Sequence, residues 1–274
     1  MNRQNLLSIV GDFVQPQAHP GLVLLSSREL GKMRRVGRLA ANLLKHLEPM
    51  VQPGVSTQAL DDEAARWMQA HGAVSATLGY APPGYPPFTG SICTSVNEVV
   101  CHGIPNPNQI LKDGDIINID VTPRLDGYHG DTSRTFLVGN VSATARKLVE
   151  ATQASMMRGI AEIKPGARVG DIGAAIQAYA EAKGFSVVRD MVGHGIGRQM
   201  HTEFQIPHYG KRGSGLKLRP GMVFTVEPML NEGTSNLKFL ADRWTVITKD
   251  KKLSAQFEHT VAVTEEGVEV LTLP

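Results

Sequence analysis

Leu111-Lys-Asp-Gly-Asp-Ile-Ile-Asn-Ile-Asp120 and Leu218-Arg-Pro-Gly-Met-Val-Phe-Thr-Val-Glu227 are two copies of one pattern. Each copy begins with leucine, turns at a glycine, continues as an apolar strand and ends in a carboxylate. An acidic residue at the end of a buried strand is costly unless a positive group compensates for its desolvation. The two copies therefore predict a pair of strands, related by an internal twofold, that bring Asp120 and Glu227 to one central point.

Two further matches occur in the same order along the chain. Val51-Gln-Pro-Gly-Val and Ile163-Lys-Pro-Gly-Ala each precede a helical pattern, and Cys101-His-Gly-Ile104 matches Gly193-His-Gly-Ile196. Pro-Gly turns are common, so chance similarity of turn–strand units remains the alternative. The shared order favours two similar halves of helices followed by strands, folded face to face.

Capping and turn signals predict the other elements. Ser26 and Glu29 form a capping box that begins a helix ending near Leu47. Further helices are expected at about 57–71, 142–162 and 169–183, and a Gly/Pro-rich loop at 79–90. Strands are expected at Ile116–Val121, Thr135–Val138, Met222–Val226, Trp244–Ile247, Glu258–Val263 and Val268–Leu273.

Length and composition restrict the class of protein. The 274 residues include 28 Lys+Arg and 26 Asp+Glu, a balance that gives no footprint for specific nucleic-acid binding. Two cysteines favour a reducing compartment. The apolar run Leu6–Val10 is shorter than the roughly 7–15 residues of a secretory signal, and no run reaches the ~18 apolar residues of a membrane span. We expect a cytoplasmic protein without a membrane segment, with 1–25 as an N-terminal extension and 26–274 as one catalytic domain.

Five segments place acids or histidines in apolar or glycine-rich surroundings. They are Asn118-Ile-Asp120-Val-Thr, His129-Gly-Asp131-Thr-Ser, Gly193-His194-Gly-Ile-Gly, Thr225-Val-Glu227-Pro-Met and Gln256-Phe-Glu258-His-Thr. Carboxylates with one imidazole suit Mn²⁺, Fe²⁺, Co²⁺ and Zn²⁺. Four carboxylates and one histidine exceed the needs of a single tetrahedral site, and they fit two metals that share ligands.

Each of these residues also has a structural explanation. Asp131 could close a hairpin, and His194 could be an exposed turn histidine between glycines. Glu227 could be a surface acid at a strand end, and Glu258 could face solvent on an edge strand. Asp120 is the hardest to explain in this way, because an apolar run precedes it and a valine follows.

The five segments resemble the metal-ligand segments of the type I methionine aminopeptidases. The resemblance extends from about Glu29 to Leu273 in the family order, and Asn97-Glu-Val-Val-Cys-His102-Gly-Ile-Pro105 is similar to a segment particular to these enzymes. It implies the pita-bread fold, an α/β (α+β) architecture of two pseudo-twofold-related halves around a central antiparallel sheet. That fold agrees with the internal repeats.

The resemblance implies a ligand set and its division between two divalent metal ions. Asp120, Asp131 and Glu258 would bind one ion, and Asp131, His194, Glu227 and Glu258 the other, with Asp131 and Glu258 bridging. The ions could be Co, Mn, Fe or Zn, because affinity order and cellular supply rather than ligand type decide which metal is bound.

The resemblance also implies three catalytic residues. Glu227 would be both a ligand and the group that moves a proton from water to the leaving amine. His201 would donate a hydrogen bond to the scissile carbonyl as charge develops on its oxygen. His102 would contact the scissile amide nitrogen or the substrate backbone. Packing in glycine-rich loops is the alternative explanation for both histidines.

A methionine side chain needs a soft, apolar pocket. Cys93, Met200, Trp244 and either Tyr80 or Tyr85 are the candidates, because sulfur–aromatic contacts suit a thioether. Core packing is the alternative explanation for each of them, and the sequence does not decide between the two tyrosines.

The implied function is removal of the initiator methionine from the N-termini of nascent polypeptides when the second residue is small. The ribosome exit region is the corresponding place of action, and a monomer is expected. Two alternatives remain. An Xaa-Pro aminopeptidase or dipeptidase of the same fold usually has a separate N-terminal domain, which 25 residues cannot supply. A non-catalytic pita-bread binding protein would be expected to lack metal ligands.

Overall fold

The computed structural model describes residues 22–274. The greater part of the expected N-terminal extension, residues 1–21, lies outside these described residues. Leu25, at the end of that segment, is buried, and its N–H donates to the Gly221 carbonyl at 2.8 Å. Within the described residues, no helix combines the length and the hydrophobicity needed to cross a membrane.

Four α-helices lie within a residue or two of their expected positions. Ser26 caps the first through the predicted capping box, and Ser56 and Ser142 cap two others by accepting backbone N–H bonds at the third helical position. Their bounds are α2 Ser27–Leu47, followed by a 3₁₀ turn Glu48–Met50, then α3 Thr57–Ala70, α4 Ala143–Ala161 and α5 Val169–Ala182.

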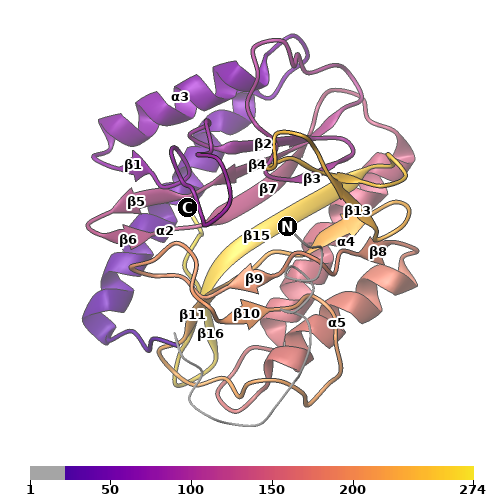
Figure 1. The fold of residues 1–274 in the computed structure, drawn as a ribbon. Coiled ribbons are helices and arrows are strands. Elements are labelled where there is room, and N and C mark those ends of the chain that lie inside the picture. The colour runs from indigo at the N-terminus through magenta and orange to yellow at the C-terminus, as the bar shows by residue number, and fades with distance from the viewer. Residues whose placement is uncertain (1–21) are drawn as a thin grey trace.

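A central antiparallel sheet spans the molecule, and its long strand β15 crosses the middle (Figure 1). The sheet order is β2 Cys93–Val96, β4 Ile116–Val121, β7 Thr132–Leu137, β15 Ser254–Val263, β12 Met229–Asn231 and β8 Ser186–Val187. Two further strands, β11 Val223–Val226 and β16 Val268–Val270, also pair with β15.

Three small sheets surround the central one. The first consists of β1 Val74–Ser75, β5 Pro123–Leu125 and β6 Tyr128–His129. The second consists of β13 Leu237–Phe239, β14 Val246–Thr248 and β3 Val99–Cys101. The third joins β9 Gly193–His194 to β10 Gln205–Ile206.

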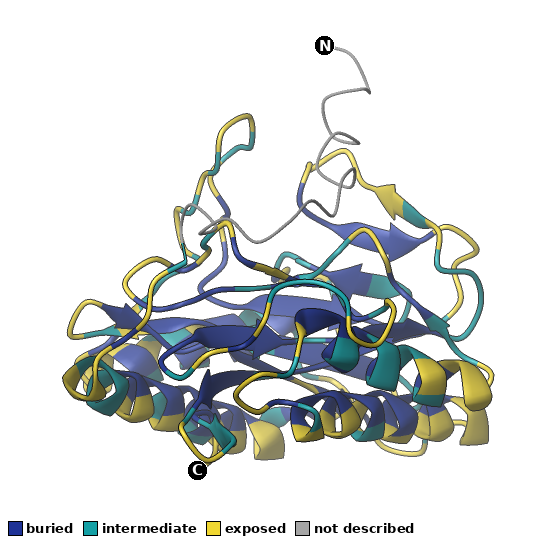
Figure 2. Cartoon of the chain, turned by 90° about the horizontal axis from the view of Figure 1, so that it is seen from below, coloured by how far each residue is buried: buried dark blue, intermediate teal, exposed yellow. Residues whose placement is uncertain are grey.

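The helices cover one face of the sheet, and loops lie on the other (Figure 2). Helices α2 and α4 contact several strands, including β7 of the central sheet, while α3 packs on α2 and β1, and α5 packs on α4, β8 and β10. Each helix pair buries an apolar cluster of its own against its half of the sheet. The helical face is therefore the core side, and the loop face is free to hold a site.

The turn before each repeated strand has the same hydrogen bonds in both halves. Leu111 accepts from the Gly54 N–H at 2.8 Å and donates to the Val55 carbonyl at 2.9 Å. Leu218 makes the same two bonds at the matching positions of the second half, at 3.0 and 2.8 Å. Both leucines are almost fully buried.

The glycine that starts each strand is equally matched. Gly114 has φ +95° and donates to the Val138 carbonyl at 2.9 Å, and Gly221 has φ +86° and donates to the Val263 carbonyl at 2.9 Å. Positive φ strains a residue that has a Cβ, so glycine is required at both positions. The predicted twofold relation of the halves is confirmed by this shared geometry.

Four strand predictions need correction. The strand expected at Thr135–Val138 begins three residues earlier, at Thr132, and the strand expected at Val268–Leu273 ends at Val270. The strand expected at Trp244–Ile247 begins only at Val246, because Trp244 and Thr245 donate their N–H groups to the Asp242 side chain and form a turn. Strand β15 begins at Ser254, four residues before the expected start at Glu258. The first part of the strand was missed because it contains Ser254 and Gln256, which are polar but buried. Apolar periodicity gives no signal for such residues.

Candidate metal centre

A cavity of about 240 Å³ opens on the loop face of the sheet. Both halves of the molecule contribute to its walls. The described residues that line it include Thr77, Tyr80, Phe88, Cys93, Cys101, His102, Asp120, Thr122, Asp131, Met191, Val192, His194, Met200, His201, Thr202, Gln205, Glu227, Met229, Trp244, Gln256 and Glu258. All five predicted ligand residues and both predicted catalytic histidines are among them.

The first half supplies a pair of carboxyl groups. Asp120 lies on β4 opposite Ser133 of β7, and Asp131 lies in the turn before β7. The two carboxyl groups are close enough for each to shift the pKa of the other, and Asp131 accepts a hydrogen bond from the Thr122 hydroxyl at 2.8 Å. The Asp120 Oδ1 atom is buried without a hydrogen-bond partner among the described residues. Such an orphaned oxygen points to a missing cation.

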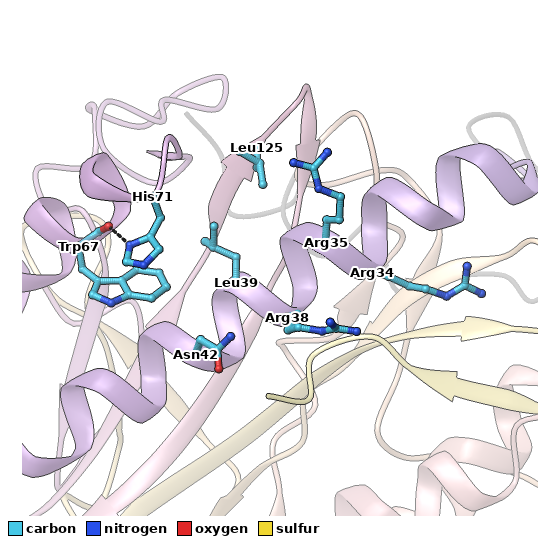
Figure 3. A pocket seen from close by; sticks show the side chains of 8 residues that line it. All are labelled: Arg34, Arg35, Arg38, Leu39, Asn42, Trp67, His71 and Leu125. Atoms are coloured by element: carbon cyan, nitrogen blue, oxygen red, sulfur yellow. Dashed lines mark hydrogen bonds between the residues drawn. The ribbon is translucent and has the colours of Figure 1, made fainter.

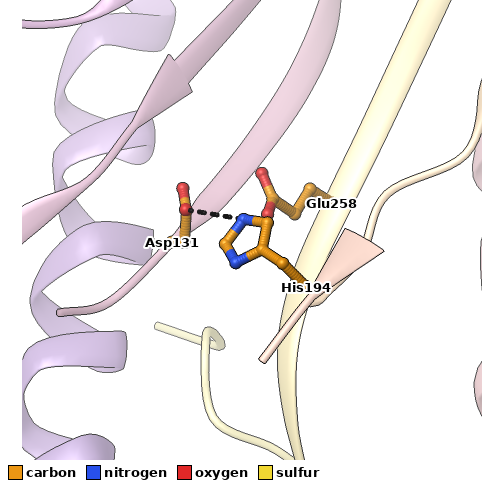
Figure 4. Close-up of side chains that lie close together, drawn as sticks. All are labelled: Asp131, His194 and Glu258. Atoms are coloured by element: carbon orange, nitrogen blue, oxygen red, sulfur yellow. Dashed lines mark ion pairs between the residues drawn. The ribbon is translucent and has the colours of Figure 1, made fainter. Parts of the chain in front are cut away.

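The second half brings a histidine and two glutamates to the same point. His194 Nε2 lies 3.7 Å from Asp131 Oδ2 and 3.6 Å from Glu227 Oε1. Ligand atoms of Asp131, His194 and Glu258 all lie within 4.8 Å of one another, and Figure 4 shows their side chains converging from three separate segments. The arrangement places five candidate ligands around one space.

Burial shifts the pKa of every candidate ligand in this cluster towards the neutral form. Burial raises the pKa of Glu227 to about 8 and that of Asp131 to about 6. Burial, reinforced by the neighbouring carboxylates, raises the pKa of Asp120 and of Glu258 well above the usual range. Burial lowers the pKa of His194 to about 4, so its ring is neutral near pH 7.

Neither lysine nor arginine is among the described residues that line the cavity, so the chain itself offers no counter-charge there. Oxygen donors with one neutral imidazole are the set preferred by divalent cations of intermediate softness. A bound divalent cation would favour the ionised carboxylates and the neutral ring together. The residues therefore fit a metal centre.

Two further histidines lie in the cavity wall. The His201 ring is 4.2 Å from the His194 ring, and its Nδ1 is 3.0 Å from the Tyr80 hydroxyl. Desolvation and the neighbouring His194 lower the pKa of His201 to about 2, and burial lowers that of His102 to about 4. His102 also has φ +56°, an uncommon conformation that places its ring at the cavity. Both rings are neutral hydrogen-bonding groups at the edge of the metal centre.

One part of the cavity wall is apolar. Phe88, Cys93 and Trp244 form a buried cluster there, and the Trp244 indole N–H donates to the Pro86 carbonyl at 2.9 Å. Met200 is another wall residue. These contacts give a rigid surface with one thiol and two aromatic rings.

The structure distinguishes the two tyrosines of the loop. Tyr80 lines the cavity, whereas Tyr85 is not among its lining residues. The Tyr85 ring packs against Trp244 at 5.1 Å between centroids. Tyr85, expected beside the substrate, therefore lies behind Trp244 and supports it.

Three residues around Glu227 received no role from the sequence. Thr225 donates to Glu227 Oε1 at 2.7 Å, and the Gln256 amide donates to Oε2 at 3.3 Å. His208 Nε2 accepts the Glu227 N–H at 3.1 Å. Thr225 and Gln256 each precede a glutamate by two residues, the spacing that puts two side chains on the same face of a strand. For His208 the sequence has no local signal.

A larger hollow of about 430 Å³ lies on the helical face between α2 and α3. Figure 3 shows Arg34 and Arg35 pointing away from Trp67 rather than converging with it. The two arginines are held in ion pairs, Arg34 with Glu269 at 2.7 Å and Arg35 with Asp126 at 2.8 Å. The hollow has no grouping of side chains suited to chemistry.

Known proteins share both the sequence and the fold. Methionine aminopeptidase B from Synechocystis sp. is 87% identical over 273 residues, 100% of both chains. Methionine aminopeptidase from Salmonella typhimurium is 52% identical over 90% of this chain and 92% of its own. The crystal structure of methionine aminopeptidase from Rickettsia prowazekii superposes with a TM-score of 0.89 at 49% identity, covering 92% of this chain and 100% of that one.

The family model agrees with these likenesses. The model of metallopeptidase family M24 matches residues 31–265, a span that includes the whole cavity. The pita-bread fold and the metallopeptidase site expected from the sequence are those of this family. The chain therefore belongs to metallopeptidase family M24, in its methionine aminopeptidase branch.

Proposed function

We propose that this enzyme removes the initiator methionine from the N-termini of nascent polypeptides when the second residue is small. The supporting observation is one cavity whose walls combine five candidate metal ligands with the apolar cluster of Phe88, Cys93 and Trp244. Its volume of about 240 Å³ suits one side chain rather than a long peptide segment. The relatives described above are named methionine aminopeptidases.

Two divalent ions, Co, Mn, Fe or Zn, would be held in the cluster. Asp120, Asp131 and Glu258 would hold one ion, and Asp131, His194, Glu227 and Glu258 the other. Ions held there would supply Lewis-acid activation of the attacking water and of the scissile carbonyl. The orphaned Asp120 Oδ1 and the carboxylates without a counter-charge support this assignment.

Glu227 moves the proton. A carboxylate next to the attacking water can take its proton as general base and give it back as general acid. The two Glu227 oxygens are approached by the Thr225 hydroxyl and the Gln256 amide, which fix the plane of the carboxyl group. Glu227 takes a proton from water and returns it to the amine that leaves.

His201 and His102 bind the reacting peptide. With the Tyr80 hydroxyl donating to His201 Nδ1, the ring proton lies on Nε2, where it can be donated to the scissile carbonyl. Because desolvation lowers the pKa of the protonated ring to about 2, His201 is a neutral imidazole with one N–H to donate. His102, on the opposite wall, contacts the amide nitrogen or the substrate backbone.

The apolar part of the wall selects methionine. The Cys93 thiol and the aromatic rings of Phe88 and Trp244 offer the sulfur–aromatic contacts that suit a thioether. Met200 completes the wall, and Tyr85 supports it from behind. The enzyme acts in the cytoplasm as a monomer, near the ribosome exit, where new N-termini emerge.

Peptide hydrolysis tests this function. We expect Met-Ala and Met-Gly peptides to be cleaved at least about tenfold faster than Met-Asn or Met-Leu peptides, because a crowded scissile bond excludes larger second side chains. Leu-Ala and Xaa-Pro peptides should be poor substrates. Equal kcat/KM for all second residues would indicate a general aminopeptidase, and faster Xaa-Pro cleavage would indicate a prolidase-type enzyme. A protein that binds no divalent metal in solution would support a non-catalytic role.

A further inference from the structure

The Glu227 carboxylate is held by groups that lie outside the proposed ligand set. We propose that Thr225 and His208 are positioning residues, which fix Glu227 and His194 in the relative orientation that metal binding and proton transfer need. This inference rests on the proposed function of Glu227 and His194, and it adds two residues to which the sequence assigned no role.

The Thr225 hydroxyl joins the two ligand segments. Thr225 is fully buried on β11, where its Oγ1 accepts the His194 backbone N–H at 2.9 Å and donates to Glu227 Oε1 at 2.7 Å. A hydroxyl has one proton, so its donation to the carboxylate sets the direction of the bond. One side chain therefore fixes the spacing between the His194 backbone and the Glu227 carboxylate.

The backbones of β9 and β11 are too close for this spacing to change easily. A Cβ placed on Gly193 would lie 2.4 Å from the Thr225 carbonyl oxygen, and Gly195 forms a bridge with Phe224. Real Cβ atoms do not approach that closely, so glycine is required at position 193. The close contact keeps the Thr225 hydroxyl between the His194 backbone and the Glu227 carboxylate.

His208 holds the other end of Glu227. The paired part of β11 ends with Val226 opposite His259, and Pro228 follows without an N–H group. Fully buried His208 accepts the Glu227 N–H on Nε2 at 3.1 Å, so the ring proton lies on Nδ1, which has no hydrogen-bond partner among the described residues. A buried N–H without a partner would be costly, and His208 supplies that partner just where the ladder ends.

The first experiment compares Thr225→Val with Thr225→Ser in the full chain. Valine keeps the shape and removes the hydroxyl, whereas serine keeps the hydroxyl. Outer partners of metal ligands typically contribute about 10–100-fold in affinity or activity. We therefore expect Thr225→Val to raise the Kd for Mn²⁺ by about that factor in calorimetric titration of the metal-stripped protein. Its kcat with excess Mn²⁺ should fall about tenfold or more at a nearly unchanged KM. Thr225→Ser should restore both values.

Thr152→Val is the matched control. Thr152 is also a fully buried threonine, but its hydroxyl donates to the Leu148 carbonyl at 2.7 Å inside α4, away from the cavity. Its Mn²⁺ affinity and kcat should equal those of the unaltered protein. Wild-type values in Thr225→Val would overturn the proposal, and so would equal damage in Thr225→Ser, which would point to the methyl group instead.

The second experiment tests the positioning role of His208. It keeps the proposal testable if Thr225→Val does not fold. His208→Gln keeps an acceptor for the Glu227 N–H, whereas His208→Leu removes it. We expect the glutamine variant to retain more Mn²⁺ affinity and a higher kcat than the leucine variant, and equal loss in both would overturn the role of His208. Mn²⁺ titration does not involve a substrate. Unaltered protein that binds Mn²⁺ without cleaving Met-Ala-Ser would therefore contradict the proposed function and not the positioning role.

Discussion

The two halves of this enzyme build their ligand strands on the same turn but support the carboxylates differently. In the first half, Asp131 accepts a hydrogen bond from Thr122, and one Asp120 oxygen is buried without a partner among the described residues. In the second half, both Glu227 oxygens and the Glu227 N–H are bonded to neighbouring side chains. An incompletely bonded carboxylate suits a static ligand, and a fully oriented one suits proton transfer. The duplicated scaffold therefore has two specialised halves.

The largest expected effect separates the two kinds of carboxylate. Glu227→Gln should lower kcat by about 10²–10⁴-fold even with saturating metal, because the proton carrier is lost. Asp120→Asn should weaken metal binding, and its kcat should recover in part as metal concentration is raised. Steady-state kinetics over a metal titration measures both. If Glu227→Gln keeps more than about a tenth of the kcat, its assigned role is wrong.

The next effect concerns the hydrogen bond to the scissile carbonyl. His201→Ala should lower kcat by about 10²–10³-fold, because the bond strengthens as negative charge develops on the oxygen. Binding of a product-like ligand such as free methionine should change much less. A rise in KM at unchanged kcat would instead assign His201 to ground-state binding.

A smaller effect is expected from the tyrosine that contacts this histidine. Tyr80→Phe removes the hydroxyl 3.0 Å from His201 Nδ1, and one such hydrogen bond contributes about 1 kcal/mol, or roughly fivefold in rate. Tyr85→Phe is the control, because Tyr85 lies outside the cavity lining. The kcat of Tyr80→Phe should therefore be lower than the kcat of Tyr85→Phe. Equal kcat values would show that the Tyr80 hydroxyl does not contribute to the reaction.

The smallest effect is on the stability of the metal-free protein. Burial raises the pKa of Glu227 to about 8, so the folded chain binds more protons than the unfolded chain between about pH 4.5 and 8. Stability from this group is present at low pH and is lost as pH rises through that window. Between pH 5 and pH 8, the Tm of Glu227→Gln should therefore fall by a few degrees less than the Tm of the unaltered protein. For a chain of this size, about 1 kcal/mol of stability corresponds to ~2–4 °C in Tm. Thermal unfolding in EDTA at pH 5 and pH 8 measures the difference, and parallel curves would contradict it.

Much of the fold was predictable because its elements have local signals. The capping box of Ser26 and Glu29 and the Pro-Gly turns place the helices within a residue or two. The strands beside the site were less predictable. Their buried positions include Ser254 and Gln256, whose side chains donate hydrogen bonds to Asn231 and Glu227, far away along the chain. Only the folded chain shows those contacts.

The site residues also differ in whether they have a local sequence signal. The five candidate ligands stand out as acids or a histidine in apolar or glycine-rich surroundings, and the structure places them around one cavity. Their roles as ligands stay a prediction until metal is measured. His208 lies 19 residues before Glu227 in a loop segment without a pattern, so its contact with the Glu227 N–H needed the structure. Tyr80 lines the cavity and Tyr85 does not, a difference for which the sequence has no signal.

Strand β15 has a consequence for the order in which the molecule is made. It pairs with β7 of the first half and with β11 and β12 of the second, and all three are translated before it. Glu258, a candidate ligand in both proposed metal sites, lies within β15. During synthesis, each helix pair can collapse on its own apolar cluster while the two halves still lack the strand that joins them. The metal-binding geometry is thus completed late in translation, and the growing chain has no finished active site until β15 has left the ribosome.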